Sequence, residues 1–213
     1  MAEAATYSQS GTLSTSQSSQ RVGSFARLVS DILSPPMMAI PCMAVGVLYS
    51  DVPGTVWYAL MYLAVALPLP LVFVMWLVKT GRVTDFHLSE RRERIAPFAA
   101  SVSAALLAAM LLAYCAAPTV FLAPVLTALI QTMLLFVITL VWQISIHTAT
   151  VAALATFTIL ALGVELWPVA LLVPLVAWSR LYLNRHTLAQ VVGGAVVGAG
   201  TFLTLFALRG IVW

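Results

Sequence analysis

Charged side chains are scarce in this chain of 213 residues. Only 8% of the residues are Asp, Glu, Lys or Arg, whereas soluble domains carry about 25%. Hydrophobic residues make up 62% of the sequence, and the mean hydropathy is +1.03. This composition excludes an ordinary soluble domain and indicates an integral membrane protein, whose outer surface meets lipid instead of water.

Cysteines and clustered carboxylates are also scarce. Both cysteines, Cys42 and Cys115, lie in apolar runs, which excludes a disulfide framework or a cysteine metal site and favours a packing role. Asp85, Glu90 and Glu93 share one polar stretch, but their spacing does not form a metal site on its own. We interpret them as solvated charges that balance nearby arginines, and we expect no metal and no cofactor.

The amino-terminal 25 residues differ in composition from the rest of the chain. They are rich in Ser, Thr, Gln, Ala and Gly and have few large apolar groups, so they cannot bury enough surface to become ordered. We expect a disordered polar tail over residues 1–25 and a single transmembrane domain over residues 26–213.

Apolar runs separated by short polar breaks fill that domain. Because a helix needs about 20 residues to cross roughly 30 Å of hydrocarbon, the runs predict an all-α fold, a polytopic transmembrane bundle of about six to seven helices. Pro68 and Pro70 predict a kink in the second run. Gly194 and Gly198 predict that the last helix closely approaches a neighbour. The expected runs are 33–50, 56–79, 96–116, 119–143, 148–164, 166–180 and 187–208.

Alternating crossings of the membrane bring the scarce polar residues to one side. All three histidines, His87, His147 and His186, fall there, together with every Lys and Arg except Arg209. By the positive-inside rule this side is cytoplasmic. The basic pI of about 9.1 therefore indicates topology and anion binding, not nucleic-acid binding.

Three polar clusters on this side contain complementary parts of a phosphate site. They are Arg91-Arg92-Glu93-Arg94, then Ser145 with His147, and finally Ser179-Arg180 with His186. Arginine presents a planar fork of donors that matches phosphate oxygens, and helix amino termini offer free N–H groups to an anion. Two imidazoles can act as nucleophile and as acid. The clusters predict a phosphate pocket that contains two histidines.

The third cluster has a recognisable spacing. Ser179-Arg180, five residues and then His186 resemble the third signature of the type 2 phosphatidic acid phosphatase superfamily, the integral membrane lipid phosphatases. Ser145 and His147 resemble part of the second signature, Pro-Ser-Gly-His. Residues 87–95 resemble the first, Lys-x6-Arg-Pro, where Arg94 takes the arginine position and Arg91 can supply the missing cation. The resemblance covers about residues 79–200.

This resemblance implies a metal-independent phosphatase that works through a phosphohistidine. His186 attacks the phosphorus, while His147 protonates the leaving alkoxide and later activates water. By the family pattern, the residues that bind the phosphoryl oxygens are Arg180, Arg94, Arg91 and Ser145. Gln190 replaces the aspartate that orients the nucleophile. Its carbonyl can accept from an imidazole N–H and fix the tautomer, but it cannot stabilise an imidazolium as a carboxylate would. We therefore expect a slower enzyme, or one that uses Asp85 or another acceptor.

The expected substrate is an amphiphile such as phosphatidate or a prenyl phosphate or diphosphate. We expect the protein to lie in the cell membrane among membrane lipids, with its active face toward the cytoplasm. The sequence leaves the oligomeric state open. The alternative is a non-catalytic protein of the same fold that binds or flips an anionic lipid, which Gln190 and the altered first signature favour. A proton-coupled transporter is disfavoured, because transporter sites lie near the midplane.

Overall fold

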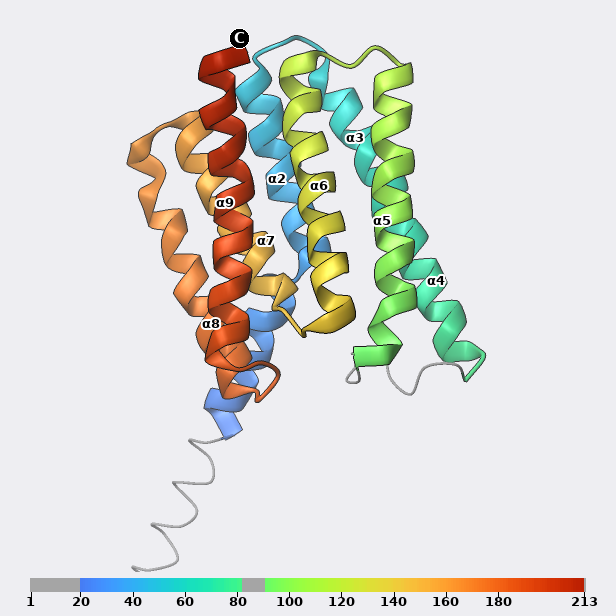
Figure 1. The fold of residues 1–213 in the computed structure, drawn as a ribbon, viewed down its shortest axis with the longest axis vertical. Helices are drawn as coiled ribbons and strands as arrows, with labels where there is room; N and C mark the ends of the chain where they lie inside the picture. Colours follow the sequence, from blue (N-terminus) through green and yellow to red (C-terminus); the bar gives the residue numbers. More distant parts are fainter. Residues whose placement is uncertain (1–19, 82–90, 213) are drawn as a thin grey trace, which may run out of the picture.

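The computed structural model describes residues 20–81 and 91–212, with side chains described for residues 20–81 and 95–209. All regular structure in these residues is helical, which confirms the all-α expectation. The chain runs through the helices in the order shown in Figure 1. After an amino-terminal helix, Gln20–Ile32, they are α2 (Pro35–Ser50), α3 (Thr55–Ala66), α4 (Pro68–Lys79), α5 (Arg91–Tyr114), α6 (Thr119–Val141), α7 (Ile146–Leu162), the 3₁₀ helix η1 (Val164–Leu171), α8 (Leu172–Tyr182) and α9 (Leu188–Val212).

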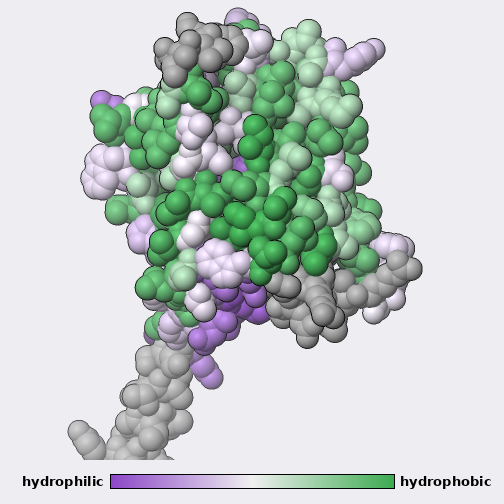
Figure 2. All heavy atoms as spheres, viewed as in Figure 1, coloured by the Kyte–Doolittle hydropathy of each residue, from purple (hydrophilic) through white to green (hydrophobic). Residues whose placement is uncertain are grey.

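The helices form the polytopic bundle that the hydropathy predicts. Among the described residues, five helical stretches are long and apolar enough to cross a membrane: α3 with α4, the apolar part of α5, α6, η1 with α8, and α9. The amino-terminal helix and α2 are bent by 49° relative to each other, and they make a sixth crossing only if the pair is one broken span. Helix α7 is apolar but shorter, with 17 residues. Apolar side chains cover the sides of the bundle, and hydrophilic ones gather at its lower end in the view of Figure 2. The chain is an integral membrane protein.

Prolines mark where the helices begin and break. Pro35 and Pro36 occupy the first turn of α2, where a missing N–H costs no hydrogen bond. The kink predicted in the second run lies at Leu67, between α3 and α4, and Pro68 starts the second half.

Two sequence boundaries need correction. Residues 20–25, expected in the polar tail, already belong to the amino-terminal helix, because Ala26 and Val29 bury one face of that helix and order its start. Residues 1–19 lie outside the described part of the chain. The sixth run also begins as the 3₁₀ helix η1, which contains Pro168, before α8 continues it.

Helix α7 is the most enclosed element of the bundle. It contacts α2, α8, η1 and above all α9, and its side chains from Val151 to Ala155 are all buried. The contact with α9 depends on the predicted glycines. A Cβ on Gly194 would lie 2.4 Å from the carbonyl oxygen of Ser145, and one on Gly198 would lie 2.0 Å from that of Ala149. Backbone therefore meets backbone here, as the spacing of these glycines predicts.

The bundle brings the ends of several helices to one side. At the lower end in Figure 1 lie the start of α5, the connection from α6 to α7 and the connection from α8 to α9. His147 and His186 belong to the last two of these. His147 and His186 therefore lie at the same end of the bundle, as predicted. His87 lies outside the described residues.

The glycine contact leads to a stability prediction. We expect Gly198→Ala to lower the free energy of unfolding by about 1–3 kcal/mol, since the added methyl overpacks two backbones. Gly200→Ala is the matched control, because nothing lies within 4 Å of a Cβ built there. The measurement is denaturant unfolding in detergent micelles. Equal stability of the two variants would show that the close approach of α7 and α9 is not needed.

Candidate functional site

The starts of α7 and α9 are joined directly, which fixes the relative position of the two histidines. The backbone N–H of Ser145 donates to the carbonyl oxygen of Gln190 at 3.2 Å. Ser145 is the residue before α7 and Gln190 lies in the first turn of α9. His147 follows the first of these residues by two positions, and His186 precedes the second by four.

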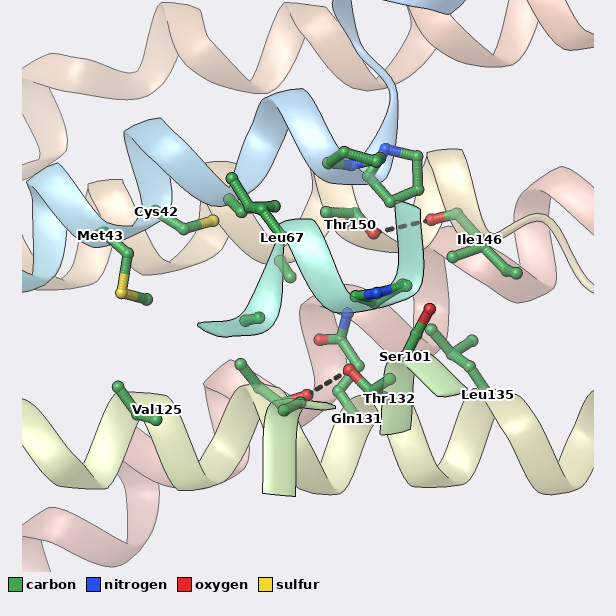
Figure 3. A pocket seen from close by; sticks show the side chains of 18 of the residues that line it. Cys42, Met43, Leu67, Ser101, Val125, Gln131, Thr132, Leu135, Ile146 and Thr150 are labelled. Carbon is green, nitrogen blue, oxygen red and sulfur yellow. Dashed lines mark hydrogen bonds between the residues drawn. The ribbon is translucent and has the colours of Figure 1, made fainter. Parts of the chain in front are cut away.

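His147, Arg180 and His186 line one cavity of about 440 Å³. Two sequence-distant segments, one around His147 and one from Arg180 to His186, thus bring a cation and two imidazoles to the same space. No described acidic side chain lines it, so the charge at this end of the cavity is suited to an anion. Beyond these residues the walls are mainly apolar, and Figure 3 shows Cys42, Met43, Leu67 and Val125 among them.

The imidazole of His186 is held in one orientation by Gln190. His186 is buried, with 8% of its surface exposed, and its Nδ1 lies 3.1 Å from Gln190 Oε1. The backbone N–H of Thr187 also donates to this oxygen, at 3.0 Å. Because the N–H of Thr187 can only donate, the amide oxygen must face both groups. The Nδ1 of His186 therefore carries a proton and donates it to this contact.

Gln190 has a second role at the start of α9. Thr187 Oγ1 accepts from the Gln190 N–H at 3.4 Å while the Gln190 side chain accepts from the Thr187 N–H. This reciprocal pair is a capping box, which satisfies two backbone donors at a helix start. The same side chain thus caps α9 and orients His186.

Arg180 is positioned by the amino-terminal helix. Its Nη1 donates to Ser30 Oγ at 2.7 Å, and Ser30 is buried. The preceding residue, Ser179, is fully buried and donates to the carbonyl oxygen of Ala26 at 2.6 Å. Ser179 therefore fastens α8 to the amino-terminal helix, and Ser30 directs the guanidinium that lines the cavity.

His147 lies in the first turn of α7, and Ser145 is the cap of that turn. Ser145 is fully buried, and its Oγ lies 2.8 Å from Thr148 Oγ1 and accepts from the Thr148 N–H at 3.4 Å. Ser145 is not among the residues that line the cavity. Its hydroxyl orders the helix start that carries His147, and the phosphate contact expected from the sequence stays a prediction.

The first polar cluster is only partly described. The backbone of Arg91 and Arg94 forms the first turn of α5, but their side chains lie outside the described ones. The residues that follow them, Pro97, Phe98 and Ser101, line the cavity. The first cluster therefore starts the helix that forms one wall of the site. Among the side chains that the structure describes, no three His, Cys, Asp or Glu groups come together as metal ligands, and metal independence stays a prediction.

Sequence reasoning did not find Ser30, Thr187 or Gln131 as parts of this region. Thr187 had a readable signal, since Thr-x-x-Gln before an apolar run is the capping-box pattern. Gln131 stands out as an amide within an apolar run. Ser30 had no local signal, because its contact with Arg180 joins residues 150 positions apart.

Comparison with known proteins supports the resemblance. Residues 139–211 match the family model of the PAP2 superfamily, and this segment contains the second and third clusters. No curated protein and no solved structure matches the chain. The resemblance to this superfamily of phosphatases is thus confirmed over α7, η1, α8 and α9, the part of the fold that holds both histidines and Arg180.

The shared role of Gln190 leads to a test of the site's construction. Gln190→Leu removes the acceptor for the Thr187 N–H and for His186 Nδ1, so we expect the free energy of unfolding to fall by about 1–2 kcal/mol. Gln190→Glu is the matched control, since it keeps an acceptor oxygen of similar reach. Denaturant unfolding in micelles at neutral pH measures both. If the leucine variant is as stable as the wild type, Gln190 does not cap α9.

Proposed function

We propose that the protein is a membrane-embedded lipid phosphate phosphatase that hydrolyses its substrate through a phosphohistidine. The observation that carries this proposal is the single cavity in which His147, Arg180 and His186 lie together at one end while apolar side chains form most of the remaining wall. A cavity of this kind suits an amphiphile, whose phosphate occupies the polar end and whose hydrocarbon follows the apolar walls.

In the first step, Nε2 of His186 attacks the phosphorus. A P–N bond forms as the bond from phosphorus to the ester oxygen breaks, and His147 gives the leaving alkoxide its proton. In the second step, His147 takes a proton from water, the oxygen of that water attacks the phosphorus, and the P–N bond breaks. For a phosphomonoester the products are the lipid alcohol and inorganic phosphate. For a diphosphate the bond from phosphorus to the bridging oxygen breaks, the lipid monophosphate leaves in place of the alkoxide, and the products are that monophosphate and inorganic phosphate.

Charge stabilisation would come from the arginine side chains. The guanidinium of Arg180, directed by Ser30, binds the phosphoryl oxygens as their charge develops. Arg94 and Arg91 complete this binding from the start of α5, and the ordered start of α7 adds its N–H groups. Positioning and charge supply most of what phosphoryl transfer needs, so the proposed reaction uses no metal and no cofactor.

The proposed substrate is phosphatidate or a prenyl phosphate or diphosphate, taken from the cell membrane. Lys79, Arg180 and Arg185 lie at the end of the bundle that holds the histidines, and Arg209 lies near the opposite end of α9. The positive-inside rule therefore supports an active face toward the cytoplasm. Such an orientation suits a lipid phosphate that is made on the cytoplasmic side.

Binding or flipping of an anionic lipid without hydrolysis is the second candidate. It uses the same cavity, and the observation in its favour is that Gln190, not a carboxylate, contacts the proposed nucleophile. A neutral amide orients the ring but stabilises an imidazolium less than a carboxylate would. Lipid binding that survives loss of His186, with no turnover by the wild type, would support this candidate.

The proposal predicts the behaviour of the nucleophile variant. Purified protein in detergent should release phosphate from phosphatidate or a prenyl phosphate with a metal chelator present, and vanadate should inhibit it. His186→Ala should lower the rate by at least about 10³-fold, because no other group replaces the attacking nitrogen. The measurement is phosphate release at saturating lipid.

The neighbouring Arg185 provides the control for this experiment. Arg185 lies in the same connection but does not line the cavity, so Arg185→Lys should keep the rate within a few fold of wild type. If His186→Ala and the wild type release phosphate at equal rates, the phosphohistidine mechanism is wrong.

A further inference from the structure

A second polar feature lies deeper in the same cavity. Gln131, in the middle of α6, lines the cavity and has only 5% of its surface exposed. Figure 3 shows Val125 and Leu135, two apolar wall residues, on either side of it, and Ser101 and Thr132 close by. An amide in such a place is costly unless its polar atoms find partners.

One end of this amide is fixed, and the other faces the cavity. Thr201 Oγ1 in α9 donates to Gln131 Oε1 at 2.7 Å. Figure 3 shows the amide nitrogen directed toward the middle of the cavity. No described residue accepts a hydrogen bond from this nitrogen. The side chain thus presents two N–H donors to whatever occupies the cavity.

The hydroxyls near Gln131 have partners within their own helices. Ser101 donates to the carbonyl oxygen of Pro97, Thr132 to that of Ala128, and Thr150 to that of Ile146. Two of these bonds are visible in Figure 3. The Gln131 nitrogen is therefore a donor that a ligand can use in this part of the wall, while Tyr62, which carries a hydroxyl, also lines the cavity.

The distance of Gln131 from the histidine end follows from the helix contacts. Thr201 lies about one turn beyond Gly198, which faces Ala149 of α7. His147 precedes Ala149 by two residues, so the amide lies roughly one to two helical turns, or ~5–10 Å, beyond His147 along the bundle. A group within a few bonds of the phosphate would reach it.

We propose that Gln131 selects acylated glycerol phosphates by donating a hydrogen bond from Nε2 to an ester carbonyl of the lipid. In such a lipid the esters follow the phosphate by a few bonds, whereas a prenyl phosphate has only hydrocarbon there and a dialkyl ether analogue lacks the carbonyl. This inference rests on the proposed phosphatase function and names its substrate class. Gln131 is a specificity-determining residue, and Thr201 is the residue that positions it.

The test compares three lipids on wild type and Gln131→Leu. Both proteins are assayed for phosphate release from diacylglycerol phosphate, from its dialkyl ether analogue and from a prenyl phosphate, in mixed micelles. We expect the wild type to prefer the diacyl lipid by about 10-fold in kcat/KM and Gln131→Leu to lose that preference, because only the carbonyl can accept the bond. Thr132→Val is the matched control: it removes a cavity hydroxyl that is already bonded to its own helix, so the preference should persist.

The outcomes separate this inference from the proposed function. Equal hydrolysis of the two lipids by the wild type, or a diacyl preference that survives Gln131→Leu, overturns the role of Gln131 and leaves the phosphatase intact. Faster release from a prenyl phosphate than from the diacyl lipid by the wild type overturns the role as well. If none of the lipids releases phosphate, the proposed function itself is refuted, and the substrate selection falls with it. Thr201→Val gives a second variant, and it should weaken the preference without removing the amide.

Discussion

The close approach of α7 and α9 is the constraint on which the rest of this site depends. Two glycines let the backbones touch, and the N–H of Ser145 donates to the carbonyl of Gln190 at the end where both helices begin. His147 lies in the first turn of α7, and His186 lies two residues before α9, where Gln190 holds its ring. The contact between the two helix starts thus limits the separation of the two histidines, since sites supported by helices are held more precisely than sites on loops alone.

The bilayer explains why so few polar residues serve so many purposes. Each polar group in an apolar bundle needs a partner, because hydrocarbon provides none. Gln190 caps α9 and orients His186 with the same oxygen, and the amino-terminal helix meets the same need at α8 by accepting from Ser179 and Arg180. The resulting cavity has a cationic end, which suits a phosphate group, and apolar walls, which suit the hydrocarbon of a lipid.

The sequence predicted the bundle, its approximate helix limits and the side on which the histidines lie, because hydropathy and parity need no tertiary information. The spacing of the glycines also predicted the close approach at Gly198, and the family resemblance implied the contact between Gln190 and His186. The partnership of Arg180 with Ser30 could not be predicted, because it joins distant segments. The capping of α7 by the Ser145 hydroxyl could not be predicted either, because it depends on the local backbone geometry.

The most direct measurement is an experimental structure of the protein in lipid nanodiscs with orthovanadate, which mimics the transferring phosphoryl group. The central claim is that His186 and His147 act on one phosphoryl group held by Arg180. It predicts vanadium bonded to Nε2 of His186, with vanadate oxygens within hydrogen-bond distance of the Arg180 guanidinium and of His147. Vanadate bound elsewhere, or a cavity that holds it without contact to His186, would contradict the claim.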